Sequence, residues 1–326
     1  MTVTTDERNP APPDEAVTPP PTGNDSRSRG KQSIKFESPR WLLVPGLALL
    51  GIVIVVPLGI AFWISTLDLD QYTLRSWLSS PFIGVGNYVD ALLETRVLHS
   101  IWISLSSSIL ITVITLPIGL VAALTVHNTM KARGIIRALY LIPYIMPAFV
   151  AATIWRTLLQ PDGAVNNLLG TVGIDGGYWL IGDRAYVTLV LVAVWTSWPF
   201  IYLLTLAALQ GIPMEVYEAA VIDGAGYFKK LRYIVIPQLK GSLALALLVA
   251  LLSHLNSFTI PYVLFGNPAP DAVAVLPMLT YSTSFASFRF GLGSAMAIFS
   301  LVLIAIPLFV YVRAVKLDSG ESEGKK

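Results

Sequence analysis

A polar run interrupts one of the most apolar stretches of the sequence. Residues 253–259 read Ser-His-Leu-Asn-Ser-Phe-Thr, with apolar residues on both sides. His254, Asn256 and Ser257 supply hydrogen-bond donors and acceptors without net charge when the imidazole is neutral. Such groups suit the hydroxyls of a sugar, and polar groups in an apolar span tend to mark a substrate pathway. Hydrogen bonding between packed helices, worth about 0.6 kcal/mol on average, is the alternative interpretation.

A second run combines aromatic rings with a residue that kinks helices. Residues 194–200 read Val-Trp-Thr-Ser-Trp-Pro-Phe. The rings of Trp195 and Trp198 can stack on the apolar face of a pyranose, while Pro199 removes a helix hydrogen bond. We therefore take Trp195, Ser197 and Trp198 as candidate pathway residues. The alternative is that the two tryptophans pack at the kink.

The residue types needed for most catalysis and metal binding are scarce. The chain has no cysteine, which excludes disulfides, thiolate metal sites and cysteine nucleophiles. Its three histidines, His99, His127 and His254, are too widely spaced to predict a metal site. No Gly-x-x-x-x-Gly-Lys-Ser/Thr loop is present, so the sequence predicts no P-loop binding of ATP. We expect no catalytic residue, no metal site and no cofactor in this chain.

The elements that position these residues are predicted to be membrane-spanning helices. Hydrophobic residues make up 54% of the 326 residues and charged residues only 13%, against about 25% in a typical soluble domain. The first apolar stretch would form a helix of about 36 Å, enough to cross a hydrocarbon core of about 30 Å. The sequence therefore predicts an all-α integral membrane protein with six transmembrane helices, at about 41–64, 100–126, 135–158, 185–210, 241–265 and 292–312.

The predicted third span differs from the others because it contains charged residues. Arg137 lies near one end and Arg156 near the other, so both side chains can reach toward the interfaces. No other lysine or arginine lies between the interfaces, which favours a neutral substrate over a phosphorylated one. Because no aspartate or glutamate lies in the six spans, an ion-coupled transporter or channel is the weaker alternative. An intramembrane enzyme is weaker still, because His254 has no acidic neighbour.

The distribution of positive charge predicts the orientation in the membrane. Seventeen of the 22 lysines and arginines fall in the N-terminal tail, the connections near 127–137 and 211–240, and the C-terminal end. Since cytoplasmic loops carry the excess of positive charge, both termini are expected in the cytoplasm. We expect residues 1–40 to form a disordered tail, 41–315 the transmembrane domain, and 316–326 a cytoplasmic C-terminal tail. The net charge of +2 gives no reason to expect a nucleic-acid partner.

The connection 211–240 is the longest one on the predicted cytoplasmic side. Pro213 suits the first turn of a helix, Gly224 is a natural stop, and Asp223 can cap a second helix. Pro237 then marks the start of the fifth span. Apolar residues within this helix–bend–helix element would let a soluble partner grip it. By itself this pattern also fits an amphipathic linker lying on the membrane.

A motif in this connection resembles the signature of permease subunits of ATP-binding-cassette importers. That signature is Glu-Ala-Ala, three residues, Gly, nine residues, Ile, one residue and Leu-Pro. Here Glu218-Ala219-Ala220, Gly224, Ile234 and Pro237 match at those spacings, with Ile236 where leucine is usual. The resemblance implies the type I permease fold and a coupling helix that docks on an ATPase. It assigns that role to Glu218, Ala219, Ala220, Asp223, Gly224 and Ala225.

The same resemblance implies the composition of a transporter in the cytoplasmic membrane. This chain would act with a second homologous permease, two ATPase subunits that bind ATP and Mg²⁺, and an extracytoplasmic sugar-binding protein, in contact with lipid. Residues 254–268 resemble the corresponding span of maltose-type sugar permeases: Asn256 and Phe258 match an Asn-Asn-Phe run, and Ser257 replaces its second asparagine. The resemblance implies import of a neutral sugar, such as the disaccharides trehalose or maltose.

Overall fold

The structure is a computed structural model that describes residues 43–127 and 132–323, with side chains through Val315. The expected tail of residues 1–40 lies outside the described residues. The chain divides into two compact units at Leu49 and Leu50, inside the first helix. The described part of the first unit is only the start of that helix. The second unit, from Leu50 onward, holds the rest of α1 and all the other described helices.

The described residues are helical and contain no strand, apart from an isolated bridge between Leu67 and Phe82. The long helices are α1 (Val44–Ser65), α3 (Thr95–His127), α7 (Arg184–Gln210), α10 (Ile236–Leu255) and α13 (Phe290–Glu323). The shorter helices are η2 (Leu74–Ser79), α2 (Gly86–Leu93), α4 (Arg133–Ile145), α5 (Ala148–Leu158), α6 (Ala164–Thr171), α8 (Met214–Ile222), α9 (Tyr227–Lys230), η3 (Leu231–Val235), α11 (Thr259–Phe265), η4 (Asp271–Val273), α12 (Leu276–Tyr281) and η5 (Ser282–Ala286).

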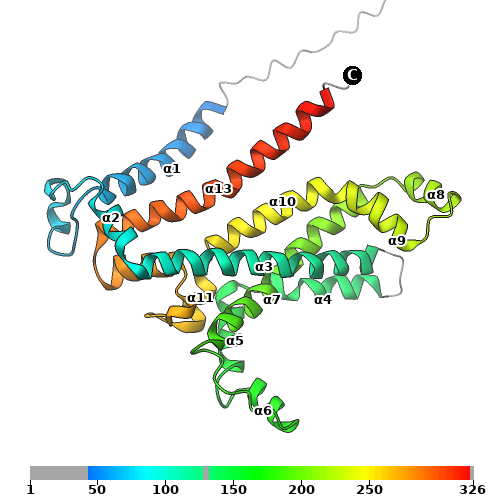
Figure 1. Cartoon of the computed structure of the whole chain (residues 1–326), viewed down its shortest axis with the longest axis horizontal. Helices are drawn as coiled ribbons and strands as arrows, with labels where there is room; N and C mark the ends of the chain where they lie inside the picture. Colours follow the sequence, from blue (N-terminus) through cyan, green and yellow to red (C-terminus); the bar gives the residue numbers. More distant parts are fainter. Residues whose placement is uncertain (1–42, 128–131, 324–326) are drawn as a thin grey trace, which may run out of the picture. The chain divides into compact units, whose positions relative to one another are not determined.

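The helices α3 and α7 form the centre of the packing, and α10 lies along both (Figure 1). Buried positions of α3 recur every three or four residues, so one face of this helix is covered. Small residues on that face allow close approach, and several of its hydroxyls bond to the backbone of their own helix. Thr112, for example, donates to the carbonyl of Ser108 at 2.7 Å. The hydroxyl of Ser104 ties α3 to α12 by accepting the Leu276 N–H at 2.7 Å.

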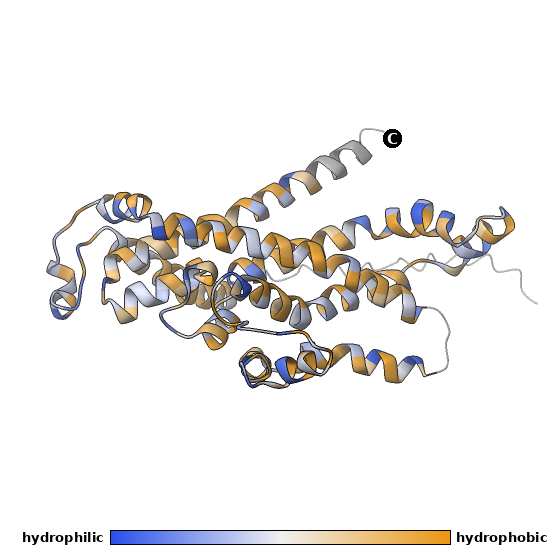
Figure 2. Ribbon diagram, turned by 60° about the horizontal axis from the view of Figure 1, so that its bottom comes forward, coloured by the Kyte–Doolittle hydropathy of each residue, from blue (hydrophilic) through white to orange (hydrophobic). Residues whose placement is uncertain are grey.

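Among the described residues, five helices are long and apolar enough to cross a membrane, and a bent pair makes a sixth candidate. Figure 2 shows apolar residues along these long helices. Most large apolar side chains of α1 and of α13 up to Val315 are exposed, as expected of surfaces that face lipid or another subunit. The predicted all-α membrane fold is therefore confirmed. The predicted limits of the first, second, fourth and sixth spans agree with α1, α3, α7 and α13, although α3 and α13 are longer than expected.

The predicted third span, at about 135–158, consists of two helices. Helices α4 and α5 meet at an angle of 90° (Figure 1). Met146 adopts an extended conformation with ψ of 132° because Pro147 follows it. A proline disfavours the helical region for the residue before it, so the first helix ends there and a second one begins. The polypeptide chain therefore turns between α4 and α5 and does not cross the domain in one direction.

The prediction of one continuous fifth span over 241–265 is wrong. The candidate span runs from Tyr227 through Leu255, so it starts earlier and stops earlier. Residues 256–258 are not helical, and α11 begins at Thr259. Arg156 of α5 contacts the backbone of α11, because its Nη1 donates to the Val263 carbonyl at 3.0 Å. Basic side chains commonly satisfy the last carbonyls of a helix in this way.

Candidate functional site

The connection between α7 and α10 carries a well-formed helix end. Gly224 has φ of +68°, and its N–H donates to the Val221 carbonyl at 3.0 Å. The Ala225 N–H donates to the Ala220 carbonyl at 2.9 Å. These two bonds and the left-handed glycine make a Schellman motif, which closes α8 and turns the chain sharply. The bend predicted at Gly224 is therefore present.

One detail of that prediction is wrong. Asp223 is the C-cap of α8. It does not cap the second helix, whose N-cap is Gly226. The second helix then runs without a break through η3 into α10, so Pro237 lies inside the continuous segment. The reason is that Asp223 has backbone angles near the helical region, φ −71° and ψ 3°, and the reversal occurs one residue later.

The outer surface of α8 and α9 is both apolar and charged. Val221, Ile222 and Phe228 are exposed, with Ile222 at 86% and Phe228 at 82% of their maximal surface. Glu218 and Ala219 are exposed on the same helix, whereas Ala220 is buried. Among the described residues Glu218 makes no ion pair or side-chain hydrogen bond, so its carboxylate is available to a partner.

The inner surface of α8 is anchored in the protein. Val216 and Tyr217 pack against a buried cluster that includes Val126 of α3, Leu209 of α7 and Leu239 of α10. Tyr217 also lines a small cavity of about 120 Å³, and its ring lies 6.0 Å from that of His127. Burial raises the pKa of the Tyr217 hydroxyl, which makes no hydrogen bond in the part of the chain that the structure describes. The sequence did not predict this anchoring, and α8 thereby contacts the ends of three long helices.

The polar run predicted as a pathway lies where α10 stops. His254 is in the last turn of α10, Asn256 is its C-cap, and Ser257 and Phe258 form the non-helical link. The side chain of Asn256 is exposed and that of Ser257 is half-buried; neither bonds to a described residue. Nε2 of His254 is buried and has no hydrogen-bond partner within the described residues. The predicted fifth span over 241–265 places these groups near its middle. The structure places them at the end of a helix instead, because α10 ends at Leu255.

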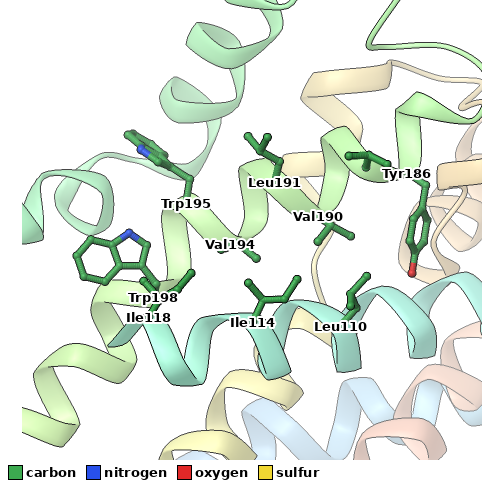
Figure 3. A pocket seen from close by; sticks show the side chains of 10 residues that line it. Leu110, Ile114, Ile118, Tyr186, Val190, Leu191, Val194, Trp195 and Trp198 are labelled. Atoms are coloured by element: carbon green, nitrogen blue, oxygen red, sulfur yellow. The ribbon is translucent and has the colours of Figure 1, made fainter. Parts of the chain in front are cut away.

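The tryptophans of α7 line a groove that the polar run does not line. Trp195 and Trp198 line a groove of about 560 Å³ between α3 and α7. Figure 3 shows both rings together with aliphatic side chains such as Ile114 and Val194. Trp195 packs edge-on against Trp155 at 5.7 Å, and Trp198 against Tyr140 at 5.3 Å. The groove is apolar, so it offers stacking surfaces and few groups for sugar hydroxyls.

Ser197 does not share this groove with the tryptophans. Its hydroxyl donates to the Ala193 carbonyl of its own helix. No hydrogen bond or ring contact within the described residues joins Trp195, Ser197 or Trp198 to the run 254–258. The predicted pathway residues thus form two separate groups, and the free polar groups belong to the second one. Among the described residues no cluster of histidine, aspartate or glutamate could hold a metal ion.

A comparison with known families settles what kind of protein carries these features. Residues 115–316 match the family described as "Binding-protein-dependent transport system inner membrane component". The chain belongs to this family. It is an inner-membrane transport subunit and not an enzyme. This assignment decides for the importer permease over the ion-coupled transporter left open by the sequence.

Curated relatives of this permease cover most of its length. A trehalose/maltose transport system permease protein, MalF, of Thermococcus litoralis is 32% identical over 83% of this chain and 91% of its own. A sulfoquinovosyl glycerol transport system permease protein, SmoG, of Agrobacterium fabrum is 31% identical over 84% and 89%. A trehalose transport system permease protein, SugA, of Mycobacterium tuberculosis is 30% identical over 87% and 91%.

Solved structures confirm the fold of the permease. A bacterial ABC transporter that imports the acidic polysaccharide alginate matches with a TM-score of 0.70 at 22% identity, covering 84% of this chain and 94% of that chain. The MetNI methionine ABC transporter matches with a TM-score of 0.53 at 17% identity, covering 68% and 94%. At these identities the likeness concerns the fold, which is that of the importer permeases.

Proposed function

We propose that this permease imports a neutral disaccharide, trehalose or maltose, as part of an ATP-driven importer. The observation that carries the proposal is the set of uncharged, unpartnered groups at the end of α10, on His254, Asn256 and Ser257. Uncharged donors and acceptors match sugar hydroxyls, and they carry no charge that would attract an anion. The names of the relatives from Thermococcus litoralis and Mycobacterium tuberculosis support trehalose or maltose.

We further propose that α8 is the coupling helix. Its exposed apolar residues and the free carboxylate of Glu218 offer a docking surface for an ATPase subunit, with Ala219, Asp223, Gly224 and Ala225 forming the edge of that surface. Val216 and Tyr217 on its other side connect it to α3, α7 and α10. A displacement of α8 by the ATPase would therefore reach the three helices at the centre of the domain.

The proposed transporter contains this chain, a second homologous permease, two ATPase subunits and an extracytoplasmic sugar-binding protein. The ATPases bind ATP and Mg²⁺. Both termini and the α8 element lie in the cytoplasm, which agrees with the excess of lysine and arginine on that side of the chain. The link at residues 256–258 then lies toward the outer face, where the binding protein delivers the sugar.

Substrate uptake by the purified transporter tests the proposal. The assembly of both permeases, the ATPases and the binding protein is reconstituted in liposomes, and uptake of labelled trehalose, maltose and glycerol 3-phosphate is measured with ATP inside. We expect uptake of a disaccharide and none of the phosphate ester. Uptake of the phosphate ester alone would contradict the proposal of a neutral sugar.

Asn256→Ala is expected to weaken sugar uptake without affecting assembly. The amide is exposed, unpartnered and located at the helix end, so its removal costs the fold little. A single hydrogen bond contributes about 1 kcal/mol net, which corresponds to a roughly fivefold loss of uptake at low sugar concentration. Basal ATP hydrolysis should stay near normal. Initial uptake rates and size-exclusion profiles of the complex provide the two readouts.

Ser253→Ala is the matched control, one helical turn away. The Ser253 hydroxyl donates to the Val249 carbonyl of its own helix at 2.9 Å, so it is not available to a substrate. Its removal should leave uptake unchanged. Equal uptake by the two variants would show that Asn256 does not face the sugar. Dissociation of the complex in the Asn256 variant would show that its amide is structural.

A further inference from the structure

Six aromatic rings follow one another from the end of α10 to the start of α13. They come from two regions that are distant in sequence: the link with α11, and the segment that runs from α12 through η5 to the start of α13. The members of this group, which we call the aromatic row, are Phe258, Tyr262, Tyr281, Phe285, Phe288 and Phe290. The sequence analysis included only Phe258 among its candidate residues.

Neighbouring rings of the row lie beside one another in the spatial order Phe258, Tyr262, Tyr281, Phe285, Phe290 and Phe288. The rings of Phe258 and Tyr262 are stacked at 4.9 Å, and Tyr281 lies 5.1 Å from the first and 5.5 Å from the second. Phe285 follows Tyr281 at 5.2 Å. Beyond it, Phe290 lies 6.5 Å from Phe285 and 6.4 Å from Phe288. Adjacent ring centres are therefore between 4.9 and 6.5 Å apart along the row.

The row is partly open to its surroundings, and its most exposed rings lie away from α10. Phe258 and Tyr262 are half-buried and pack against a cluster that includes Ile103 and Leu189. Tyr281, Phe285 and Phe288 are exposed, Phe285 at 60% of its maximal surface. The hydroxyls of Tyr262 and Tyr281 make no hydrogen bond with any described residue. Two tyrosine hydroxyls and several ring faces are thus free to contact a ligand.

The backbone around the outer rings is unusual. Residues 282–286 form a π-helical turn. Such turns are rare in proteins, and those that occur lie frequently at functional sites. Phe288 has φ of +56°, an outlier for a bulky residue that costs free energy and needs a compensating role. The segment is held in place by Arg289, which donates to Glu94 at 3.0 Å. Within this segment the side chains of Phe285 and Phe288 are exposed.

Aromatic rings can also anchor a protein at the membrane interface without any ligand. Interface belts place separate rings around the circumference of a domain. Here the rings instead touch in sequence, and the row begins at Phe258, which directly follows the free polar groups of Asn256 and Ser257. A row that joins apolar faces to unpartnered hydrogen-bonding groups has the chemistry of a sugar-binding surface, since a pyranose has one apolar face and a hydroxyl rim.

We propose that the aromatic row is a track on which the incoming sugar stacks as it moves from the outer face to the polar link at 256–258. Phe285 and Phe288 receive the sugar, Tyr281 and Tyr262 follow with hydroxyls that bond to its rim, and Phe258 delivers it to Asn256. Because neighbouring rings offer similar surfaces, the sugar meets no single strong site at which it would be retained. This inference rests on the proposed function, since it presumes that the substrate is a sugar.

The test compares Phe285→Leu and Tyr281→Leu with Tyr72→Leu in the complete transporter. Tyr72 is 82% exposed, makes no ring contact, and lies in the α1–α2 connection, which topology places on the same side. Uptake of labelled trehalose and maltose is measured over a range of concentrations. Loss of a stacking surface should raise KM for uptake roughly three- to tenfold in each row variant, with a smaller change in maximal rate. Tyr72→Leu should leave both values unchanged.

Further variants separate the track from an anchoring role. Tyr281→Phe and Phe285→Trp keep the ring and should retain most of the uptake, and the fluorescence of the introduced tryptophan should shift when the sugar is added. Unchanged KM in both leucine variants, with normal uptake by the unmodified transporter, would overturn the track and leave the proposed function intact. Loss of assembly in the leucine variants, without a fluorescence shift in the tryptophan variant, would assign the rings to anchoring. No disaccharide uptake by the unmodified transporter would instead refute the proposed function.

Discussion

Gly224→Leu is expected to lower sugar uptake at least about tenfold while ATP hydrolysis by the assembled transporter continues. Gly224 has φ of +68°. A residue with a side chain at this backbone angle destabilises the folded state by roughly 1–2 kcal/mol. The Schellman motif at the end of α8 would open, and the direction of α8 relative to α9 would change. An altered α8 would transmit ATPase movement poorly, so hydrolysis would lose its dependence on sugar. Parallel assays of ATP hydrolysis and uptake in liposomes measure the effect.

Gly226→Leu is the matched control in the same bend. Gly226 has φ of −66°, which any residue adopts, and a side chain there meets open space. It should keep more of its coupled uptake than the Gly224 variant, because no backbone strain is introduced. If Gly224→Leu assembles and transports like the unmodified protein, α8 is not the coupling helix. Equal losses in both variants would show that the bend tolerates no side chain, whatever the backbone angle.

Gly119→Leu is expected to prevent stable folding of the permease. Gly119 lies on α3 where it meets α7, and an added Cβ would lie 2.7 Å from Ile201 Cβ and 2.8 Å from the backbone nitrogen of Tyr202. The backbone atom cannot move unless the two central helices separate. Overpacking of this kind costs about 3 kcal/mol or more, a large fraction of the stability of a domain. The yield of monodisperse protein in detergent and the Tm should both fall.

Gly241→Leu tests whether the effect is due to the contact and not to the loss of a glycine. Gly241 lies in α10, where a Cβ would have no neighbour within 4 Å. Since glycine is the poorer helix former by up to about 1 kcal/mol, this variant should be as stable as the unmodified protein or more so. Gly119→Ala, which adds only the Cβ, should show an intermediate loss of Tm. Equal stability of the two leucine variants would contradict the close approach of α3 and α7.

The sequence alone was sufficient for the class of protein and for the shape of the α8 element. Long uncharged apolar stretches can satisfy their backbone in lipid only as helices, so the spans follow from composition and length. The bend at Gly224 follows from local chemistry, because a helix end needs only the few residues around it. The match of Glu218, Gly224 and Pro237 to a known spacing is likewise local, and the family assignment agrees with it.

Only the tertiary structure decided where the polar and aromatic residues lie relative to one another. Hydropathy could not distinguish a continuous fifth span from one that ends at Leu255, because the residues after the link are as apolar as those before it. Pro147 explains locally why α4 ends at this point, but the 90° angle between α4 and α5 is known only from the structure. The aromatic row unites Phe258 with Phe288, which lie on different elements, and such contacts arise from packing between helices. A periodic sequence pattern reports only on the faces of a single helix.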